Sequence, residues 1–344
     1  MLEHGGNLQD AIARFERPRA QWLDLSTGIN PQPYPVPPLA ADVWHRLPEV
    51  SPELVVAACA YYAAPLILPI AGTQAAIQTL PRLRPPTRLV VAAPSYAEHA
   101  HRWSCAGHTV REVFYDALES AVEQCDVMIV CNPNNPTGET VPPDTLLGWA
   151  ASLASRGGWL VVDEAFADVT PEQSIAARSD QPGVVVLRSV GKFFGLAGLR
   201  LGFVAAQASL LAQLADAIGP WSVGRPAQEI GVRALTDLAW QDVTRAELTS
   251  SGARLKTLLK ASGIASSGTA LFQWWPEQAP ERFHRHMAEH GIWTRLFLGN
   301  ARGIRLGLPG NEADWQRLEH ALAGWQTERS TSHNAFVMDQ PDQN

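Results

Sequence analysis

The sequence feature that most constrains the fold is a lysine at the end of a short apolar run. The run from 184 to 187 leads through Ser189 and Gly191 to Lys192. A glycine-spaced turn then brings Arg200 before a second apolar run begins. An apolar run of this length, bounded by turn residues, is typical of a buried strand. The pattern therefore predicts a sheet with Lys192 at one edge.

A lysine in this position has three possible environments. A solvated surface is the commonest, but it does not call for flanking glycines or apolar neighbours. A phosphate-binding P-loop needs a serine or threonine directly after the lysine, and Phe193 stands there instead. The third environment is an apolar pocket, in which the lysine amine is a nucleophile that forms a Schiff base with a carbonyl cofactor. The surroundings favour this third interpretation.

The length and composition are those of an α/β enzyme. The chain has 344 residues, of which 46% are hydrophobic, and it contains 26 glycines and 26 prolines. This length predicts one large domain with a smaller companion. No apolar run approaches the roughly 18 residues of a membrane-spanning helix, so we expect a soluble protein. The formal charge of −7, with dispersed basic residues, argues against nucleic acid as a main partner, because phosphate backbones need a basic patch.

The cysteines and histidines do not predict a metal site. No C-x-x-C pair and no signal-peptide pattern is present, so we expect reduced thiols in a cytoplasmic protein. The cysteines are Cys59, Cys105, Cys125 and Cys131. His284, His286 and His290 lie close together in a polar stretch with helical spacing. A solvated helix face is the expected reading of that stretch, because it has no third well-spaced ligand.

Apolar runs alternate with helical patterns through the first two thirds of the chain. The runs cover 88–93, 109–114, 126–131, 158–163, 183–188 and 201–205. This alternation predicts a largely parallel sheet covered by helices on both faces. Ligands of such sheets bind beyond the carboxyl ends of the strands. The suggestive residues follow those ends, at Ser95–Tyr96, Asn132–Gly138, Asp163 and Ser189–Lys192.

Four segments are expected along the chain. Residues 1–38 form an N-terminal arm and a proline-rich connector, and residues 39–225 form the large domain. Residues 226–326, with part of the arm, form a small α+β domain whose last helix covers 312 to about 325. The polar, patternless tail 327–344 is expected to be disordered. The arm begins with His4-Gly5-Gly6-Asn7, which taken alone reads as a frayed terminus.

The residues at the predicted strand ends match the needs of a cofactor that has a carbonyl, a phosphate and a heteroaromatic ring. Lys192 would form the Schiff base, and Asp163 would keep the ring nitrogen protonated. Tyr96 could stack on the ring, and Asn135 could donate to the ring oxygen. A helix that starts at a glycine offers free N–H groups to a phosphate. The candidates for this phosphate cup are Gly72, Thr73, Gln74, Ser189 and Arg200.

Each of these residues also has an ordinary structural interpretation. The strand that ends at Asp163 resembles a Walker B strand, although no Walker A motif accompanies it. Tyr96 could simply pack in the core, Ser189 and Gly72 could cap secondary structure, and Arg200 could lie on the surface. The cofactor interpretation is favoured because all the candidates occur together in one order.

Three motifs carry a resemblance to a known family. The segments N-N-P-T-G (134–138), D-E-A-F (163–166) and S-V-G-K-F-F-G-L-A-G-L-R (189–200) resemble those of fold-type I pyridoxal 5′-phosphate enzymes of the class I/II aminotransferase superfamily. The resemblance covers about residues 23–325. The arm, the segment 26–31 and Pro220-Trp221-Ser222-Val223 narrow it to the threonine-phosphate decarboxylases of cobalamin biosynthesis, which are close to the histidinol-phosphate aminotransferases.

The resemblance implies a substrate and a set of residues that bind it. The reaction would convert O-phospho-L-threonine to (R)-1-aminopropan-2-ol O-phosphate and CO₂ in a homodimer that contains pyridoxal 5′-phosphate. Carried over by position, the substrate-binding residues are His4, Gly5, Gly28, Asn135, Arg295 and Arg305. Arg305 stands where the superfamily binds the α-carboxylate, while His4 and Arg295 suit the substrate phosphate by charge.

Three residues depart from the family pattern. Phe166 stands where a tyrosine usually donates to the ring oxygen, and Leu47 replaces a tyrosine that commonly reaches the partner subunit's cofactor phosphate. Gly28 occupies a position where the decarboxylases have asparagine.

Transamination of the histidinol-phosphate type is the alternative reaction. A non-catalytic regulator that binds the same cofactor is a further alternative, although it would normally carry an appended DNA-binding domain.

Overall fold

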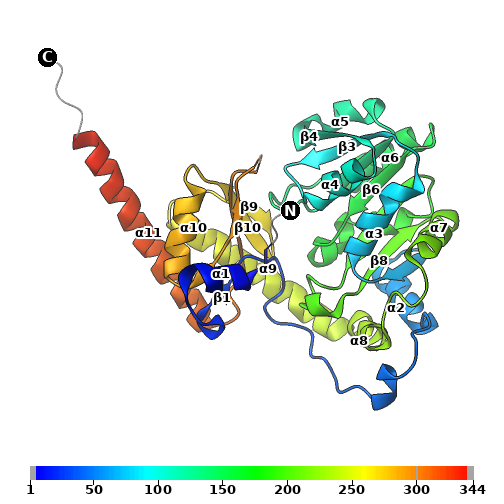
Figure 1. Ribbon diagram of the computed structural model, residues 1–344, viewed down its shortest axis with the longest axis horizontal. Helices are drawn as coiled ribbons and strands as arrows, with labels where there is room; N and C mark the ends of the chain where they lie inside the picture. Colours follow the sequence, from blue (N-terminus) through cyan, green and yellow to red (C-terminus); the bar gives the residue numbers. More distant parts are fainter. Residues whose placement is uncertain (1–4, 300, 339–344) are drawn as a thin grey trace. The chain divides into compact units, whose positions relative to one another are not determined.

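The computed structural model describes residues 5–299 and 301–338 (Figure 1). Residue contacts divide the chain into two units. Among the described residues, the larger unit is Gln32–Thr249, and the smaller unit combines 5–31 with those from Ser250 onward. The sequence placed the boundary at 225, whereas the observed boundary lies inside helix α9, Leu238–Ala261. One continuous helix therefore contributes residues to both units.

The larger unit is built on a sheet of seven strands. They are β2 (Ile67–Ile70), β3 (Arg88–Ala93), β4 (Thr109–Phe114), β5 (Val127–Cys131), β6 (Trp159–Asp163), β7 (Val184–Ser189) and β8 (Gly202–Ala206). Their spatial order is β2-β8-β7-β6-β5-β3-β4. Strand β8 runs opposite to the other six strands, so its pairings with β2 and β7 are antiparallel and the remaining pairings are parallel. The predicted α/β fold with a largely parallel sheet is confirmed.

The sequence did not predict strand β2. Its four residues include Pro69, which cannot donate to a sheet ladder. The structure places β2 at the edge of the sheet, where one side needs no ladder hydrogen bonds. An edge strand is the position in which a proline is tolerated, so the short run and the proline together concealed the strand.

Helices accompany the strands of the larger unit. They are α2 (Pro52–Tyr62), α3 (Thr73–Thr79), α4 (Glu98–Cys105), α5 (Leu118–Ala121), α6 (Pro143–Ala154), α7 (Ala208–Ile218), α8 (Arg225–Thr236) and the first part of α9. The helical spacing of the sequence continues through 227–259, which would predict one helix, but Asp237 separates α8 from α9. The carboxylate of Asp237 accepts a hydrogen bond from the Trp240 amide at 3.1 Å, which starts α9 as a new helix.

The core of the larger unit lies against the central strands. Strands β5 and β7 are buried along their whole length, and β6 is buried except at its first residue. Burial on both faces explains why these strands appear in the sequence as continuous apolar runs. Their polar residues are confined to the carboxyl ends, where Asp163 and Ser189 stand. The buried sheet thus gives those two side chains fixed positions.

The described part of the smaller unit contains an antiparallel sheet, three whole helices and the second part of α9. The sheet order is β12 (Arg295–Phe297), β13 (Gly303–Gly307), β10 (Phe272–Pro276) and β9 (Ser267–Thr269). The helices are α1 (Leu8–Phe15), α10 (Pro280–Glu289) and α11 (Glu312–Met338). Strand β1 (Leu23–Asp24) pairs in parallel with β11 (Ile292–Trp293), so the N-terminal segment belongs to this unit. Trp22 and Trp293 pack there against α1.

Helix α11 is longer than the sequence predicts. The expected end was near Trp325, followed by a disordered tail, but the helix continues to Met338. The segment after Trp325 contains no glycine and no proline before Pro341, so nothing in it terminates a helix. Residues 339–344 of that tail lie outside the described residues.

The expectation of a solvated histidine face on α10 was wrong. His284 and His286 are both buried. His284 Nδ1 lies 2.7 Å from the Thr294 hydroxyl, and His286 Nε2 lies 2.8 Å from the Ala321 carbonyl. Burial lowers the pKa of His284 to about 4, so its ring is neutral near pH 7. Each ring therefore packs in the core through one polar contact.

No helix within residues 5–299 and 301–338 is long and apolar enough to cross a membrane.

Candidate active site

A cavity of about 170 Å³ opens in the larger unit at the carboxyl ends of β5, β6 and β7. Its lining includes all nine residues that the sequence assigned to a cofactor: Gly72, Thr73, Gln74, Tyr96, Asn135, Asp163, Ser189, Lys192 and Arg200. Cys131, Pro133, Ala165, Phe166, Gly191 and Ala197 complete it. The parallel strands therefore bring separate motifs to one place, as the sequence predicts.

Lys192 follows β7 in a turn that aromatic packing holds in place. Phe193 and Phe194 are buried, and the Phe194 ring stacks on Trp240 with centroids 5.6 Å apart. The Lys192 ammonium lies over the face of Phe166, with Nζ 5.4 Å from the ring centroid. The aromatic rings thus limit the positions that the Lys192 side chain can take in the cavity.

Asp163 pairs with a histidine that the sequence analysis did not identify. The Asp163 carboxylate lies 2.9 Å from His99 Nε2, and both side chains are buried. Burial alone would lower the pKa of His99, but hydrogen bonds with Asp163 and Cys131 raise it to about 10. His99 is therefore protonated at neutral pH and donates to Asp163. The available signal was its position three residues after Tyr96, about one helical turn away.

Gly72 and Arg200 form one end of the cavity. Gly72 has a φ of +77° and precedes α3, whose first N–H groups have no capping side chain. A Cβ at this position would lie 2.6 Å from Arg200 Nη2, so only glycine allows the guanidinium to approach. The Ser189 hydroxyl, which accepts from the Gly191 amide at 3.2 Å, lines the same cavity. These donors and the fixed cation suit a phosphate group.

A chain of hydrogen bonds holds Tyr96. Its hydroxyl lies 3.3 Å from Gln74 Oε1, and Gln74 Nε2 donates to Glu98 at 2.8 Å. Arg102 Nε in turn donates to the buried Glu98 carboxylate at 2.7 Å. Burial raises the pKa of Tyr96 to about 12, so the phenol is neutral near pH 7. Glu98 and Arg102 were not predicted from the sequence; they hold the Tyr96 ring in place through Gln74.

The loop that carries Asn135 is fixed by its neighbours. Asn132 exchanges two hydrogen bonds with the backbone of Val141, at 3.1 and 2.8 Å. The Asn134 amide donates to the Thr137 hydroxyl at 2.7 Å. These buried contacts leave Asn135 as the asparagine of this loop that lines the cavity.

The smaller unit holds the residues expected to bind the substrate, apart from Asn135. Arg295 and Arg305 are direct partners across β12 and β13, so they lie on the same face. Arg305 is buried, and its Nη2 donates to the Ser26 carbonyl at 2.8 Å. Burial and the facing Arg295 lower the pKa of Arg305. A pair of facing cations is suited to an anion.

Gly5, in the N-terminal arm, contacts the segment that contains Ser26. A Cβ on Gly5 would lie 2.3 Å from the Ser26 carbonyl oxygen, so the arm approaches too closely for any other residue. The Gly6 amide donates to the Ser26 hydroxyl at 2.7 Å. Gly28 follows two residues after Ser26. His4 lies outside the described residues.

The described residues contain one group that could hold a metal ion. The donor atoms of His99, Cys131 and Asp163 lie within 4.8 Å of one another. The hydrogen bonds of His99 with Asp163 and Cys131 explain this cluster without a metal.

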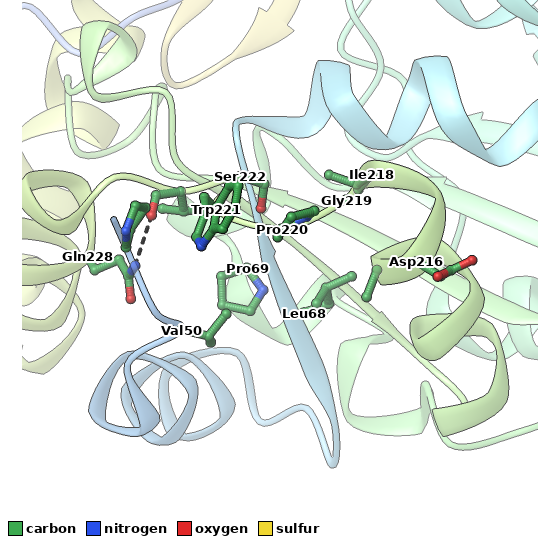
Figure 2. Close-up of a pocket in the computed structure, with 13 residues that line it drawn as sticks. Val50, Leu68, Pro69, Asp216, Ile218, Gly219, Pro220, Trp221, Ser222 and Gln228 are labelled. Carbon is green, nitrogen blue, oxygen red and sulfur yellow. Dashed lines mark hydrogen bonds between the residues drawn. The ribbon is translucent and has the colours of Figure 1, made fainter. Parts of the chain in front are cut away.

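A second hollow of about 320 Å³ lies elsewhere on the larger unit and contains none of the predicted site residues (Figure 2). Pro220, Trp221 and Ser222 line one part of it, and Leu68 and Pro69 of β2 line another. Trp221 is 58% exposed and has a φ of +60°. An exposed tryptophan beside an apolar groove is typical of a contact surface rather than a catalytic site.

Comparison with known proteins assigns the family. A model of the aminotransferase class I and II family matches residues 42–310. The chain belongs to this family. Threonine-phosphate decarboxylase from Pseudomonas aeruginosa is 49% identical, over 94% of this chain and 98% of that protein. A Sinorhizobium threonine-phosphate decarboxylase is 41% identical over the same shares.

The fold is shared with solved members of the family. The crystal structure of histidinol-phosphate aminotransferase from Sinorhizobium meliloti in complex with pyridoxal-5′-phosphate aligns with a TM-score of 0.80. The alignment covers 95% of this chain and 96% of that one at 21% identity. The cavity residues also fit the expected cofactor, because an acid, an amine, an aromatic face and a cationic cup with a glycine-only approach are present together.

The His99–Asp163 pair predicts a pH-dependent stability. The pKa of His99 is about 10 in the folded protein and about 6.5 when unfolded, so its contribution is complete below pH 6.5 and is lost as the pH rises towards 10. In urea unfolding of cofactor-free protein, we expect His99→Gln to be less stable than the wild type at pH 6. The difference should shrink by about 1–3 kcal/mol by pH 10. A difference that does not depend on pH would contradict the ion pair.

Proposed function

We propose that this chain is a pyridoxal-5′-phosphate-dependent threonine-phosphate decarboxylase of cobalamin biosynthesis. Its substrate is O-phospho-L-threonine, and its products are (R)-1-aminopropan-2-ol O-phosphate and CO₂. The observation that carries this proposal is the 49% identity to the Pseudomonas aeruginosa decarboxylase across nearly all of both chains. The cavity around Lys192 and Asp163 supports it, because its side chains match the groups of that cofactor.

The side chains of the larger unit have distinct roles in this proposal. Lys192 is the amine that attaches the cofactor, and Asp163, held by His99, keeps a proton on the ring nitrogen. Arg200, Ser189 and the start of α3 bind the phosphate. The bound cofactor supplies an electron sink for the carbanion that decarboxylation leaves. Lys192 then returns a proton to the α-carbon.

Orientation of the substrate decides which bond breaks. The bound cofactor would accept electrons from only one of the bonds to the α-carbon, so the side chains that hold the substrate must direct the α-carboxylate into that position. We assign Arg305 to the substrate carboxylate and Arg295, with His4, to its phosphate. Two anionic groups bound at two cations would fix the torsion about the α-carbon. The burial of Arg305 and its position opposite Arg295 support this assignment.

The departures from the family pattern leave every required group present. Phe166 cannot donate to the ring oxygen, so Asn135 is the side chain assigned to that oxygen. In exchange, the Phe166 ring covers the Lys192 ammonium. Leu47 is 65% exposed in the larger unit and takes no part in the cavity.

Product analysis tests the reaction. With O-phospho-L-threonine and no keto acid, we expect the wild type loaded with pyridoxal 5′-phosphate to release CO₂ and form the aminopropanol phosphate. Lys192→Ala should lose more than about 10³-fold of this rate, because the attaching amine and the proton donor are both removed. Amino-group transfer to 2-oxoglutarate without CO₂ release would instead establish the aminotransferase. Cofactor binding without turnover of any amino acid would indicate a regulator.

Steady-state kinetics test the substrate anchor. Arg305→Gln should raise the KM for O-phospho-L-threonine by about 10- to 100-fold, because it removes a charge-assisted contact with the carboxylate. The matched control is Arg302→Gln, which removes an exposed arginine that pairs with Glu281 at 3.1 Å. The control should change KM by less than about twofold. If both variants behave alike, Arg305 is not the carboxylate anchor.

We also propose that the groove beside Trp221 is a contact surface between two copies of this chain. Trp44, Leu47 and Val50 are each more than half exposed. Val50 lines this groove, Leu47 and Val50 line a neighbouring hollow, and Trp44 lies in the same segment of the chain. A large exposed apolar group of this kind usually marks an interface. A second copy is the partner that the family resemblance implies.

Light scattering after size exclusion tests the dimer. The wild type should have the mass of two chains, and Trp221→Ser combined with Leu47→Ser should shift the protein towards one chain at low micromolar concentration, because the apolar contact is lost. Phe114→Ser changes a residue that is also 65% exposed but lies on the far edge strand β4, so it should leave the mass unchanged. A monomeric wild type would contradict the proposal.

A further inference from the structure

A buried group of charges lies next to the cavity in the larger unit. Arg188 Nη1 donates to Glu164 at 2.6 Å, and its Nη2 donates to Asp168 at 3.1 Å. All three side chains are at most 2% exposed. None of them lines the cavity. The proposed reaction gives this charge network, Arg188 with Glu164 and Asp168, no role, although Glu164 belongs to the D-E-A-F segment.

The network joins the two segments that carry the reactive groups. Glu164 directly follows Asp163 at the end of β6, and Arg188 directly precedes Ser189 at the end of β7. The Glu164 amide also donates to the Leu187 carbonyl at 3.0 Å. The ion pair thus lies one residue away from two cavity residues on neighbouring strands.

Asp168 extends the same connection to the loop beyond β6. It belongs to the short helical turn Ala167–Val169, which begins one residue after Phe166. Phe166 is the ring that covers the Lys192 ammonium. Arg245 of α9 donates to the Asp168 backbone carbonyl at 3.0 Å, which anchors the turn from a second side.

Glu164 and Arg188 make further contacts outside the network, while Arg188 Nε is buried without a hydrogen-bond partner among the described residues. Glu164 accepts from the Ile175 amide at 2.8 Å and from the Ser174 hydroxyl. The Arg188 guanidinium lies 4.5 Å above the Tyr62 ring. Burial raises the pKa of Glu164 and of Asp168, while Arg188 opposes that shift. Arg188 and Arg245 supply two positive charges for the two carboxylates.

Stability alone does not explain such a network. Buried ion pairs lose hydration that their attraction only partly restores, and apolar residues of similar volume often serve the fold as well. An arginine also imposes a geometry, because its planar guanidinium can hold two carboxylates in fixed positions at the same time. Here the two carboxylates are tied by sequence to the segment that carries Asp163 and Phe166.

We propose that Arg188, Glu164 and Asp168 are positioning residues that set the placement of Asp163 relative to Lys192. Glu164 fixes the neighbouring Asp163 carboxylate, which is assigned to the cofactor ring nitrogen. Asp168 fixes the Phe166 ring against the Lys192 amine. The inference rests on the proposed cofactor site. It goes beyond that proposal because it names residues that touch neither cofactor nor substrate.

Cofactor titration of purified variants tests the inference. Arg188→Lys keeps the charge and loses the fork, while Glu164→Gln keeps the shape and loses one charge. For each protein we would measure the dissociation constant for pyridoxal 5′-phosphate, the pH midpoint of the bound cofactor's visible absorbance, and the thermal midpoint. The matched control is Asp126→Asn, which breaks the 2.7 Å pair with Arg88 at the amino end of the sheet.

We expect both network variants to raise the dissociation constant by about tenfold or more and to shift the absorbance midpoint, since small displacements at a reacting centre cost about 10- to 100-fold. The control should lower only the thermal midpoint. Equal thermal losses with unchanged cofactor binding and midpoint would overturn the inference. Glu164→Gln decides the matter if Arg188→Lys does not fold. A wild type that fails to bind the cofactor would overturn the proposed site as well.

Discussion

The parallel ladder between β6 and β7 is the interaction on which the rest of the larger unit depends. Its register places Asp163 opposite Leu187, so the acid stands just short of Ser189 on the neighbouring strand. Both strands are buried on both faces, and a slip of one residue would turn every side chain to the opposite face. The buried core therefore sets the position of Asp163 and the point at which the turn that carries Lys192 begins.

Much of this arrangement could be predicted from the sequence. Apolar runs gave the central strands to within a residue or two at each end, and the polar residues that follow them gave the cavity. What the sequence could not show were contacts between side chains on separate elements. His99, Glu98 and Arg188 look like ordinary charged residues until the fold buries them. Strand β2 and the division at Asp237 were missed because a proline and a capping aspartate act locally, against the wider pattern.

The predictions for the α10 histidines and for the tail beyond Trp325 were both wrong because they relied on the polar pattern of the sequence. The histidines of α10 lie in a polar stretch, and polarity predicts solvent exposure. The rings of His284 and His286 are instead buried, and each places a nitrogen within hydrogen-bond distance of a hydroxyl or carbonyl oxygen. The tail beyond Trp325 looked disordered because it lacks an apolar period, but a helix can continue where nothing terminates it. Pattern predicts which face is apolar better than it predicts where an element ends.

The two sets of residues proposed for the cofactor and for the substrate come from different parts of the chain. The cavity is built from residues between Gly72 and Arg200, whereas the paired arginines and the glycine arm come from the two ends. Substitutions in the terminal segments can therefore accumulate without disturbing the cofactor cavity. A lineage with this organisation can exchange one amino-acid substrate for another, or one fate of the α-carbon for another, while its central stretch stays the same. The coexistence of decarboxylases and aminotransferases among its relatives is the outcome that such an organisation allows.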